Sequence, residues 1–333
     1  MNPFYYRLRA IKIHIPMKKF LYFASIILCL LSCEDKAQVP SKIEAIDIDF
    51  ELKRFDLALA NASPDELSKL KKEYPYFFTK RFDDSYWQSR MRDTLQKEIE
   101  REVAKVFSYL DDTSQDLELL FKHISYYFPE AHIPKTITVA TDVDYRNKVI
   151  LNDSLLFVSL STYLGADHYF YDRIARFHAD DFRKEQITVD VAHAFAKAKT
   201  PPPRSSQFID YLIYEGKKIY LMEQLLSLTS TNELLSYTPQ ELAFAQENEI
   251  NIWEYFVKKE LLFDTDKKLL SRFIDPAPFS KFYLDFDNET PGRIGRYIGY
   301  RIVSSYMAKN DIPLKAMLLR DAETIFNTAK YKP

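Results

Sequence analysis

Hydrophobic positions recur at helical spacing through most of the first and last thirds of the chain. Near the start, Pro64 opens a short helix, and charged amphipathic helices are expected at 91–110 and 114–128. From residue 185 onward the same period predicts longer helices at 185–199, 205–227, 239–263 and 291–309. The prolines at 201–203 separate the first two of these with a sharp loop.

The middle of the chain follows a different pattern. Short β-branched runs at 135–142, 147–152 and 154–160 are bounded by polar turns. They predict a small antiparallel sheet. The fold class is therefore α+β, mostly α-helical, with the sheet in the middle. No linker interrupts the body, so residues 43–333 are expected to form a single α+β domain.

Residues 1–33 have the features of a bacterial lipoprotein signal peptide. Two lysines follow Met17, an apolar run of 13 residues fills 20–32, and the run ends in the letters LLSC, as a lipobox does. We expect Met17 to be the true start. Cys33 is expected to carry the lipid that anchors the protein to a membrane of the cell envelope. Residues 34–42 then form a polar tether, and the anchored body is expected on the periplasmic face of the inner or outer membrane or at the cell surface.

Charge and cysteine content exclude several classes of function. Residues 1–33 carry five of the 46 basic side chains and no acidic one, so the remainder has 41 basic against 48 acidic groups, a net of −7. No basic block survives to bind nucleic acid. The two cysteines are Cys29 and Cys33, so the body has no disulfide and no thiolate chemistry.

The first candidate for chemistry is the stretch VAHAFAK at 191–197. It resembles a zinc-binding H-E-x-x-H helix in which His193 is kept, while Ala194 replaces the catalytic glutamate and Lys197 replaces the second histidine. An ammonium group is a poor zinc ligand at neutral pH, and alanine cannot activate a water molecule. Asp190 lies one turn before His193 on the same stripe, which leaves a different metal site as an alternative.

The second candidate is Glu215, which falls in the middle of the apolar stripe of the helix at 205–227. A carboxylate in such a place needs a cationic partner or a raised pKa. Gly216 beside it costs about 1 kcal/mol in a helix interior unless another backbone comes close.

The third candidate is the block PGRIGRYIGY at 291–300. It contains three of the five glycines of the protein, Gly292, Gly295 and Gly299, close to one helical face. A groove for close helix packing is the favoured interpretation. The alternative is an anion site in which Arg293 and Arg296 flank the helix N-terminus.

These motifs resemble those of the gliding motility lipoprotein family GldB of Bacteroidetes. The resemblance rests on the lipobox, YLG at 163–165, VAHAFAK, YLIYEGKKIYLMEQLL at 211–226, PGRIGRYIGYRIVSSYM at 291–307 and the terminal AKYKP. It implies an envelope-anchored component needed for gliding and linked to the type IX secretion machinery. Its partners would be other gliding or secretion proteins of the envelope.

That family is in turn similar to predicted zinc peptidases, which implies a degenerate zincin-like fold. Carried onto this chain, the ligands fall on His193, Lys197 and Glu215 and the catalytic base on Ala194. Because two of these four positions do not match, we expect no catalytic residue, no metal and no cofactor. We also expect the Lys197 ammonium to neutralise Glu215 in place of the ion, with Arg293 or Arg296 as substitutes.

The sequence therefore predicts a non-catalytic lipoprotein that assembles or stabilises an envelope machine. Two alternatives remain open. One is a residual metalloenzyme that uses Asp190, His193 and Glu215. The other is a binding module that holds a peptide in a peptidase-derived cleft.

Overall fold

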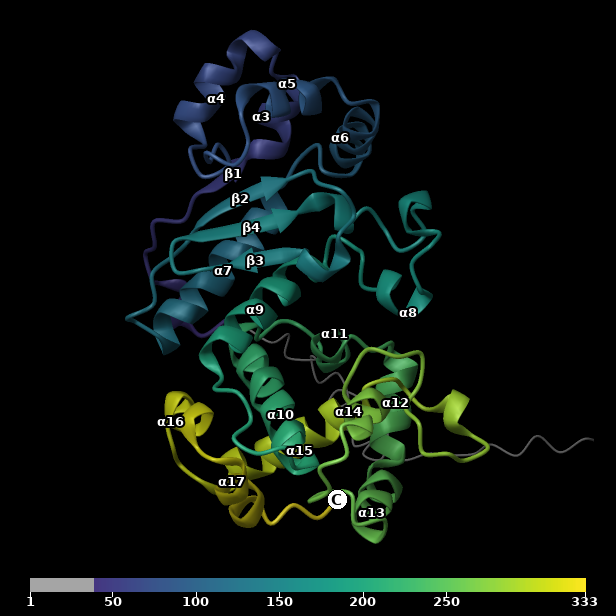
Figure 1. The fold of residues 1–333 in the computed structure, drawn as a ribbon. Helices are drawn as coiled ribbons and strands as arrows, with labels where there is room; N and C mark the ends of the chain where they lie inside the picture. Colours follow the sequence, from purple (N-terminus) through teal and green to yellow (C-terminus); the bar gives the residue numbers. More distant parts are fainter. Residues whose placement is uncertain (1–38) are drawn as a thin grey trace, which may run out of the picture. The chain divides into compact units, whose positions relative to one another are not determined.

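The computed structural model describes residues 39–333, and the signal peptide, Cys33 and most of the tether lie outside the described residues. The described part is mostly helical with one small sheet, which confirms the α+β fold class (Figure 1). The first helix, α2 (Ser41–Glu44), already begins within the segment expected to be tether, and its Ile43 is buried. No helix in residues 39–333 combines the length and apolarity that a membrane crossing requires.

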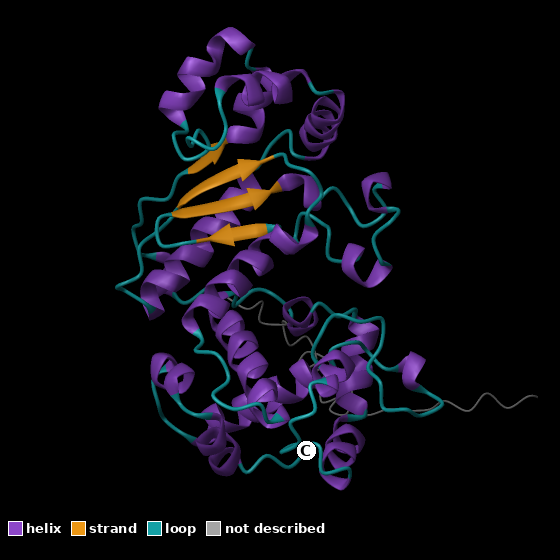
Figure 2. Cartoon of the chain, viewed as in Figure 1, coloured by secondary structure: helices purple, strands orange, loops and turns teal. Residues whose placement is uncertain are grey.

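The sheet has four strands in the order β1-β2-β4-β3 and is mixed, so the prediction of an antiparallel sheet is wrong (Figure 2). Its strands are β1 (Leu52–Arg54), β2 (Lys135–Val139), β3 (Val149–Leu151) and β4 (Leu155–Ser159). β3 and β4 form the expected antiparallel hairpin. β2 pairs with the other side of β4, and β1 with β2, both in parallel. The loop after β2 carries the chain past the position of β4, which makes this parallel pairing possible.

The two faces of the sheet belong to two separate apolar clusters. Ile137 and Phe157 are paired neighbours on one face, where they pack with aromatic side chains from the N-terminal helices. Leu156 and Val158 point to the other face and belong to the main core. Because side chains alternate along a strand, both clusters are built from the same five-residue strands.

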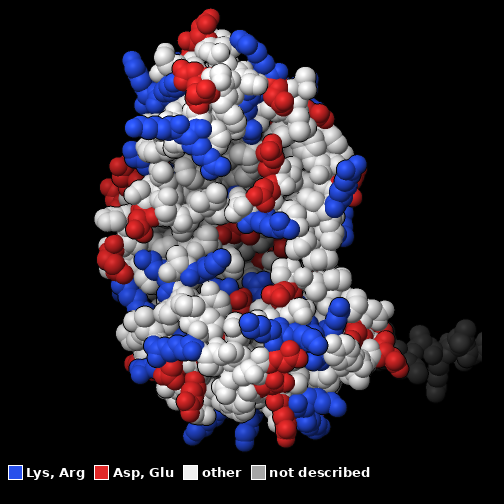
Figure 3. Space-filling model, viewed as in Figure 1, with Lys and Arg blue, Asp and Glu red and all other residues white. Residues whose placement is uncertain are grey.

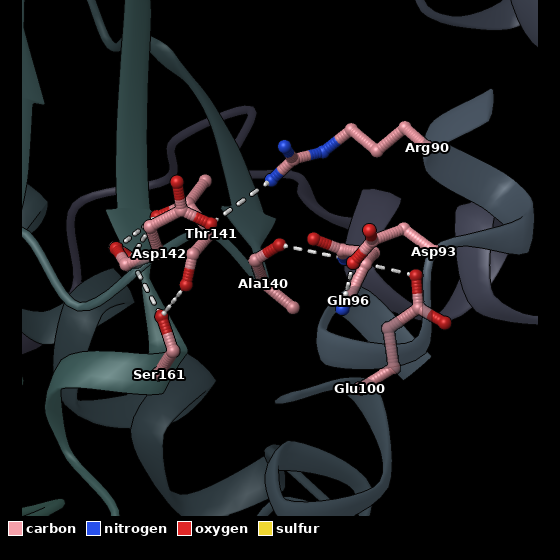
Figure 4. A network of polar contacts seen from close by, with 9 residues as sticks. Arg90, Asp93, Gln96, Glu100, Ala140, Thr141, Asp142 and Ser161 are labelled. Carbon is pink, nitrogen blue, oxygen red and sulfur yellow. Dashed lines mark hydrogen bonds and ion pairs between the residues drawn. The ribbon is translucent and has the colours of Figure 1, made fainter. Parts of the chain in front are cut away.

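The N-terminal helices cover the first face of the sheet. They are α3 (Phe55–Asn61), α4 (Leu67–Glu73) and α5 (Asp84–Arg92), while α6 (Thr94–Val106), which follows them, contributes Ile99 and Val103 to the main core. The predicted helix 91–110 is interrupted at Asp93, whose carboxylate accepts a hydrogen bond from the backbone of Gln96 and so caps α6. Figure 4 shows that Gln96 also donates to the carbonyl of Ala140, just after β2, at 3.1 Å. Next to it, at the ends of the parallel strands, the Ser159 hydroxyl bonds the hydroxyls of Thr141 and Ser161, and Ser161 also donates to the backbone carbonyl of Thr141 (Figure 4).

The second face and the C-terminal half share the main core. α7 (Asp111–Tyr127) and α9 (Gln186–Lys199) pack together on that side of the sheet, and the short α8 (Arg176–Ala179) precedes α9. α10 (Phe208–Leu225) is buried along most of its length, including Lys217 and Lys218. Around it lie α11 (Thr231–Leu235), α14 (Lys268–Phe273), α15 (Ile294–Lys309), α16 (Leu314–Leu319) and α17 (Ala322–Ala329).

The predicted helix 239–263 is two helices, α12 (Pro239–Glu247) and α13 (Glu249–Lys258), divided at Asn248. Glu249, the first residue of α13, holds the end of the chain in place. It accepts hydrogen bonds from the hydroxyls of Tyr297 and Tyr331 at 2.6 and 2.5 Å and pairs with Arg301 at 3.0 Å. The ring of Tyr331 meets Trp253 edge-on. The last residues are therefore part of the packed body.

Candidate functional site

Helix α9 presents His193 and Asp190 toward the interior of the molecule and Lys197 toward solvent. Asp190 is held by the Lys148 ammonium at 2.5 Å and by the Tyr163 hydroxyl at 2.8 Å. His193 is partly buried, and its ring has no hydrogen-bond partner within residues 39–333. The apolar residues Val191, Phe195 and Ala196 fix the helix in the core, so the orientation of this polar stripe follows from packing.

Glu215, on α10, forms an ion-pair cluster with two cations. Its carboxylate lies 2.8 Å from the Lys218 ammonium, three residues along the same helix, and 3.4 Å from the Arg296 Nε on α15. The side chain of Glu215 is 13% exposed. The predicted Lys197–Glu215 pair is wrong: Lys197 is exposed and makes no ion pair with any described residue. Arg296, the alternative partner, takes that role together with Lys218.

Helices α10 and α15 cross with their backbones in contact. A Cβ atom added to Gly216 would lie 2.1 Å from the carbonyl oxygen of Gly299, and one added to Gly299 would lie 1.8 Å from that of Leu212. Only glycine permits such an approach. The crossing therefore requires both glycines, and it brings Arg296 of α15 next to Glu215 of α10.

The other residues of the glycine block lie where α15 begins. Helix α15 starts at Ile294, three residues later than predicted. Arg293 precedes it with φ 59°, in the left-handed region, and donates a hydrogen bond to the carbonyl of Ser236 at 3.0 Å. Gly292 lies against the backbone of Ala277, and Gly295 against the carbonyl of Phe273. The arginines of the block and its glycines thus point to different neighbours.

A cavity of about 210 Å³ lies between the sheet side of the molecule and the start of α15. Its polar lining includes the side chains of Lys148, His178, Asp181, Asp190, His193, Arg293 and Arg296. Figure 3 shows acidic and basic side chains together around a hollow on this face. Of the predicted site residues, the structure brings His193, Arg293 and Arg296 to one cavity. Ala194, Lys197 and Glu215 are not part of its lining.

The electrostatics of this cavity favour neutral histidines. Burial lowers the pKa of His193 well below its usual value, and the cations Lys218 and Arg296 lower it further. Burial and Arg293 likewise lower the pKa of His178. Burial raises the pKa of Asp190, against the opposing effect of Lys148. Burial is thus the main cause of all three shifts, and it favours the uncharged form of each group.

A family model described as "Gliding motility protein GldB" matches residues 36–333 of the chain. The chain belongs to the GldB family of gliding motility proteins. This match confirms the resemblance drawn from the motifs and connects the protein with gliding motility. Searches of curated proteins and of solved structures returned no match. The zincin-like relationship of this GldB protein therefore stays a prediction.

The donors at the degenerate motif do not fit a zinc ion. Glu215 is neutralised by two cations, Asp190 is engaged by Lys148 and Tyr163, and Lys197 points to solvent. Within residues 39–333, no three histidine, cysteine, aspartate or glutamate side chains are grouped so that they could hold a metal. The alternative ligand set of Asp190, His193 and Glu215 is thus not brought together in this GldB protein.

Sequence reasoning missed several members of the cavity. Lys148 comes from a segment remote from α9, and His178 and Asp181 lie in and just after the short α8 that precedes α9; no local pattern marks these three residues. The pairing of Lys218 with Glu215 could have been predicted from the sequence. A lysine three residues after a glutamate lies on the same side of a helix, within reach of its carboxylate.

Proposed function

We propose that this GldB protein acts without catalysis, as a lipid-anchored component that assembles or stabilises the gliding machinery and the associated type IX secretion apparatus. Its family membership supports the connection with gliding, and the lipobox at Cys33 supports the anchor. The observation that carries the non-catalytic part is the ion-pair cluster: Glu215 is occupied by Lys218 and Arg296.

The physical argument concerns what a hydrolase would need at this place. A metallopeptidase requires an ion held by deprotonated donors and a carboxylate that takes a proton from the bound water. Here the position of that carboxylate is Ala194, and two cations stand where the dication would have to neutralise Glu215. A dication added beside Lys218 and Arg296 would be repelled by both.

Two measurements test the non-catalytic role. The full lipoprotein, purified in detergent, should bind less than a tenth of an equivalent of zinc after dialysis against zinc. His193→Gln, introduced at the chromosomal locus, should leave both gliding and type IX secretion of the cells unchanged. One equivalent of tightly held zinc, or amide hydrolysis that a chelator abolishes and His193→Gln removes, would overturn the proposal.

The assembly role needs a separate test in cells. Crosslinking in intact cells should capture envelope proteins with the wild-type protein, and these products should be lost with Cys33→Ala, which removes the lipid attachment point. Lys197→Gln is the matched control, because it changes one exposed charge and touches no described partner. If Cys33→Ala cells glide and give the same crosslinked products, the anchored assembly role is wrong.

A further inference from the structure

Two buried arginines that line the cavity have donors without partners. The Nε atoms of Arg293 and Arg296 are shielded from solvent and make no hydrogen bond with any described residue. Arg296 lies 3.4 Å from Glu215 without hydrogen-bond geometry, and Arg293 lies 4.0 Å from Asp181. An unsatisfied buried donor costs about 1–3 kcal/mol, more when it is charged. Because the Arg296 Nε is still ion-paired with Glu215, the Arg293 Nε is the donor for which an acceptor is missing.

A second unpartnered group lies beside Arg293. Tyr237 is 5% exposed, and its hydroxyl has no hydrogen-bond partner in the described part of the chain. It lines a neighbouring cavity of about 230 Å³. The two cavities share Phe177, Asp181, Ser236 and Arg293. The Arg293 guanidinium therefore borders both spaces, with an unused tyrosine hydroxyl on one side and His193 and Arg296 on the other.

The excess positive charge of the site is confined to the first cavity. That cavity is lined by three cations, Lys148, Arg293 and Arg296, and two carboxylates, Asp181 and Asp190, which leaves 3 − 2 = +1 while the histidines are neutral. The second cavity adds Arg183 against Asp180 and Glu241, so the two linings together carry 4 − 4 = 0. Asp190 is already occupied by Lys148 and Tyr163. Each of the two cavities, at about 210 and 230 Å³, is smaller than the roughly 300–1,000 Å³ of sites for drug-sized ligands, so each suits a compact group.

We propose that this double cavity binds a small oxyanion, a carboxylate or phosphate group, between the guanidinium groups of Arg293 and Arg296, with the Tyr237 hydroxyl as a further donor. Arginine is suited to this role because its planar fork matches both groups. The site is independent of the proposed assembly role, since it would bind the anion whether or not the protein has envelope partners.

The test is a titration of the full lipoprotein with inorganic phosphate and, separately, with acetate, at constant ionic strength set by chloride. Calorimetry and thermal unfolding should both show saturable binding of at least one anion, and the tighter of the two identifies the source chemistry. Arg293→Gln and Arg296→Gln should each weaken that binding at least tenfold. Lys259→Gln, which removes an exposed charge at the end of α13 and outside both cavities, should change it less than twofold.

Tyr237→Phe keeps the proposal testable if an arginine variant fails to fold. The Tyr237 hydroxyl has no protein partner, so its removal should leave the melting temperature of the ligand-free protein unchanged or higher, while anion affinity falls severalfold. A purely structural tyrosine would give the opposite pattern. The proposal is overturned if neither anion binds saturably, or if binding is unchanged in Tyr237→Phe and in every arginine variant that folds.

Discussion

Replacing Gly299 by alanine tests whether the α10–α15 crossing is set by backbone contact. The added Cβ would lie 1.8 Å from the carbonyl oxygen of Leu212, whereas ordinary contact begins near 3.4 Å. The helices must therefore separate by about 3.4 − 1.8 = 1.6 Å. The atom in the way is backbone of a buried helix, so no flexible side chain can move aside.

The expected cost follows from two opposing effects. Overpacking a core typically costs about 1–3 kcal/mol, and here the required shift moves a whole helix. Alanine gains back about 1 kcal/mol of helix propensity over glycine. Taking the upper end of the overpacking range less the propensity gain, we expect Gly299→Ala to lower the free energy of unfolding by about 2 kcal/mol. Arg296 should also move away from Glu215, since both depend on the same crossing.

Chemical denaturation followed by circular dichroism measures this change. Ala243→Gly, at an exposed position of α12, is the control for propensity alone and should cost about 1 kcal/mol. The pair Gly216→Ala and Gly299→Ala adds a second test, because one separation of the helices accommodates both methyl groups. The double variant should therefore cost clearly less than the sum of the single variants.

Two results would refute this reasoning. If Gly299→Ala is neutral or stabilising, the backbones are not in contact and the propensity gain decides the sign. If the costs of Gly216→Ala and Gly299→Ala are fully additive, the two glycines do not share one crossing.

Three further predictions concern buried charge and hydrogen bonds. Glu215→Gln should destabilise the protein by about 3 kcal/mol in thermal or chemical unfolding, because it leaves two cations without their shared carboxylate; a cost below 1 kcal/mol would show that solvent already screens the cluster. Stability should fall as pH drops below about 6.5, because burial lowers the pKa of His123, His178 and His193 in the folded state, so the unfolded chain binds protons that the folded chain does not. Chemical denaturation at several pH values between 7.5 and 5.5 measures how the free energy of unfolding changes with pH, and His193→Gln should reduce that change. A free energy of unfolding that does not vary with pH would contradict the lowered pKa values of these histidines. Tyr331→Phe should cost about 2 kcal/mol by loss of a hydrogen bond to a buried carboxylate, measured by denaturation followed by tryptophan fluorescence, and an unchanged midpoint would be the negative result.

The sequence predicted the helices well and the pairing of the strands poorly. Apolar periodicity located α7, α9 and α10, because burial of one face leaves a repeat that can be read without the fold. It missed most of α5, started α6 before its cap Asp93, and joined α12 to α13 across Asn248, since both of these residues lie inside continuous amphipathic patterns. Strand β1 was missed because three residues are too few to show alternation. The parallel pairing of β2 with β4 depends on the path of the irregular loop that follows β2.

At the candidate site, too, the sequence identified the residues that leave a local signal and missed those brought in by the tertiary fold. Gly216, Glu215 and the glycine block stand out locally, since each breaks the expectation for a helix interior. The partner of Glu215 was assigned wrongly because Lys197 belongs to another helix, and its direction depends on how α9 is rotated in the core. Lys148 and His178 join the cavity only through the tertiary fold.

The two edge strands of the sheet are short, which limits how another chain can pair with it. β1 and β3 have three residues each, while the two inner strands have five. β1 ends at Arg54, which is paired with Asp56, and Lys148 precedes β3. Short edge strands flanked by charged residues offer few unpaired backbone groups with which a strand of another chain could form hydrogen bonds. The sheet therefore offers a second copy of the chain little opportunity for strand-to-strand pairing, so contacts of this body fall to its side-chain surfaces.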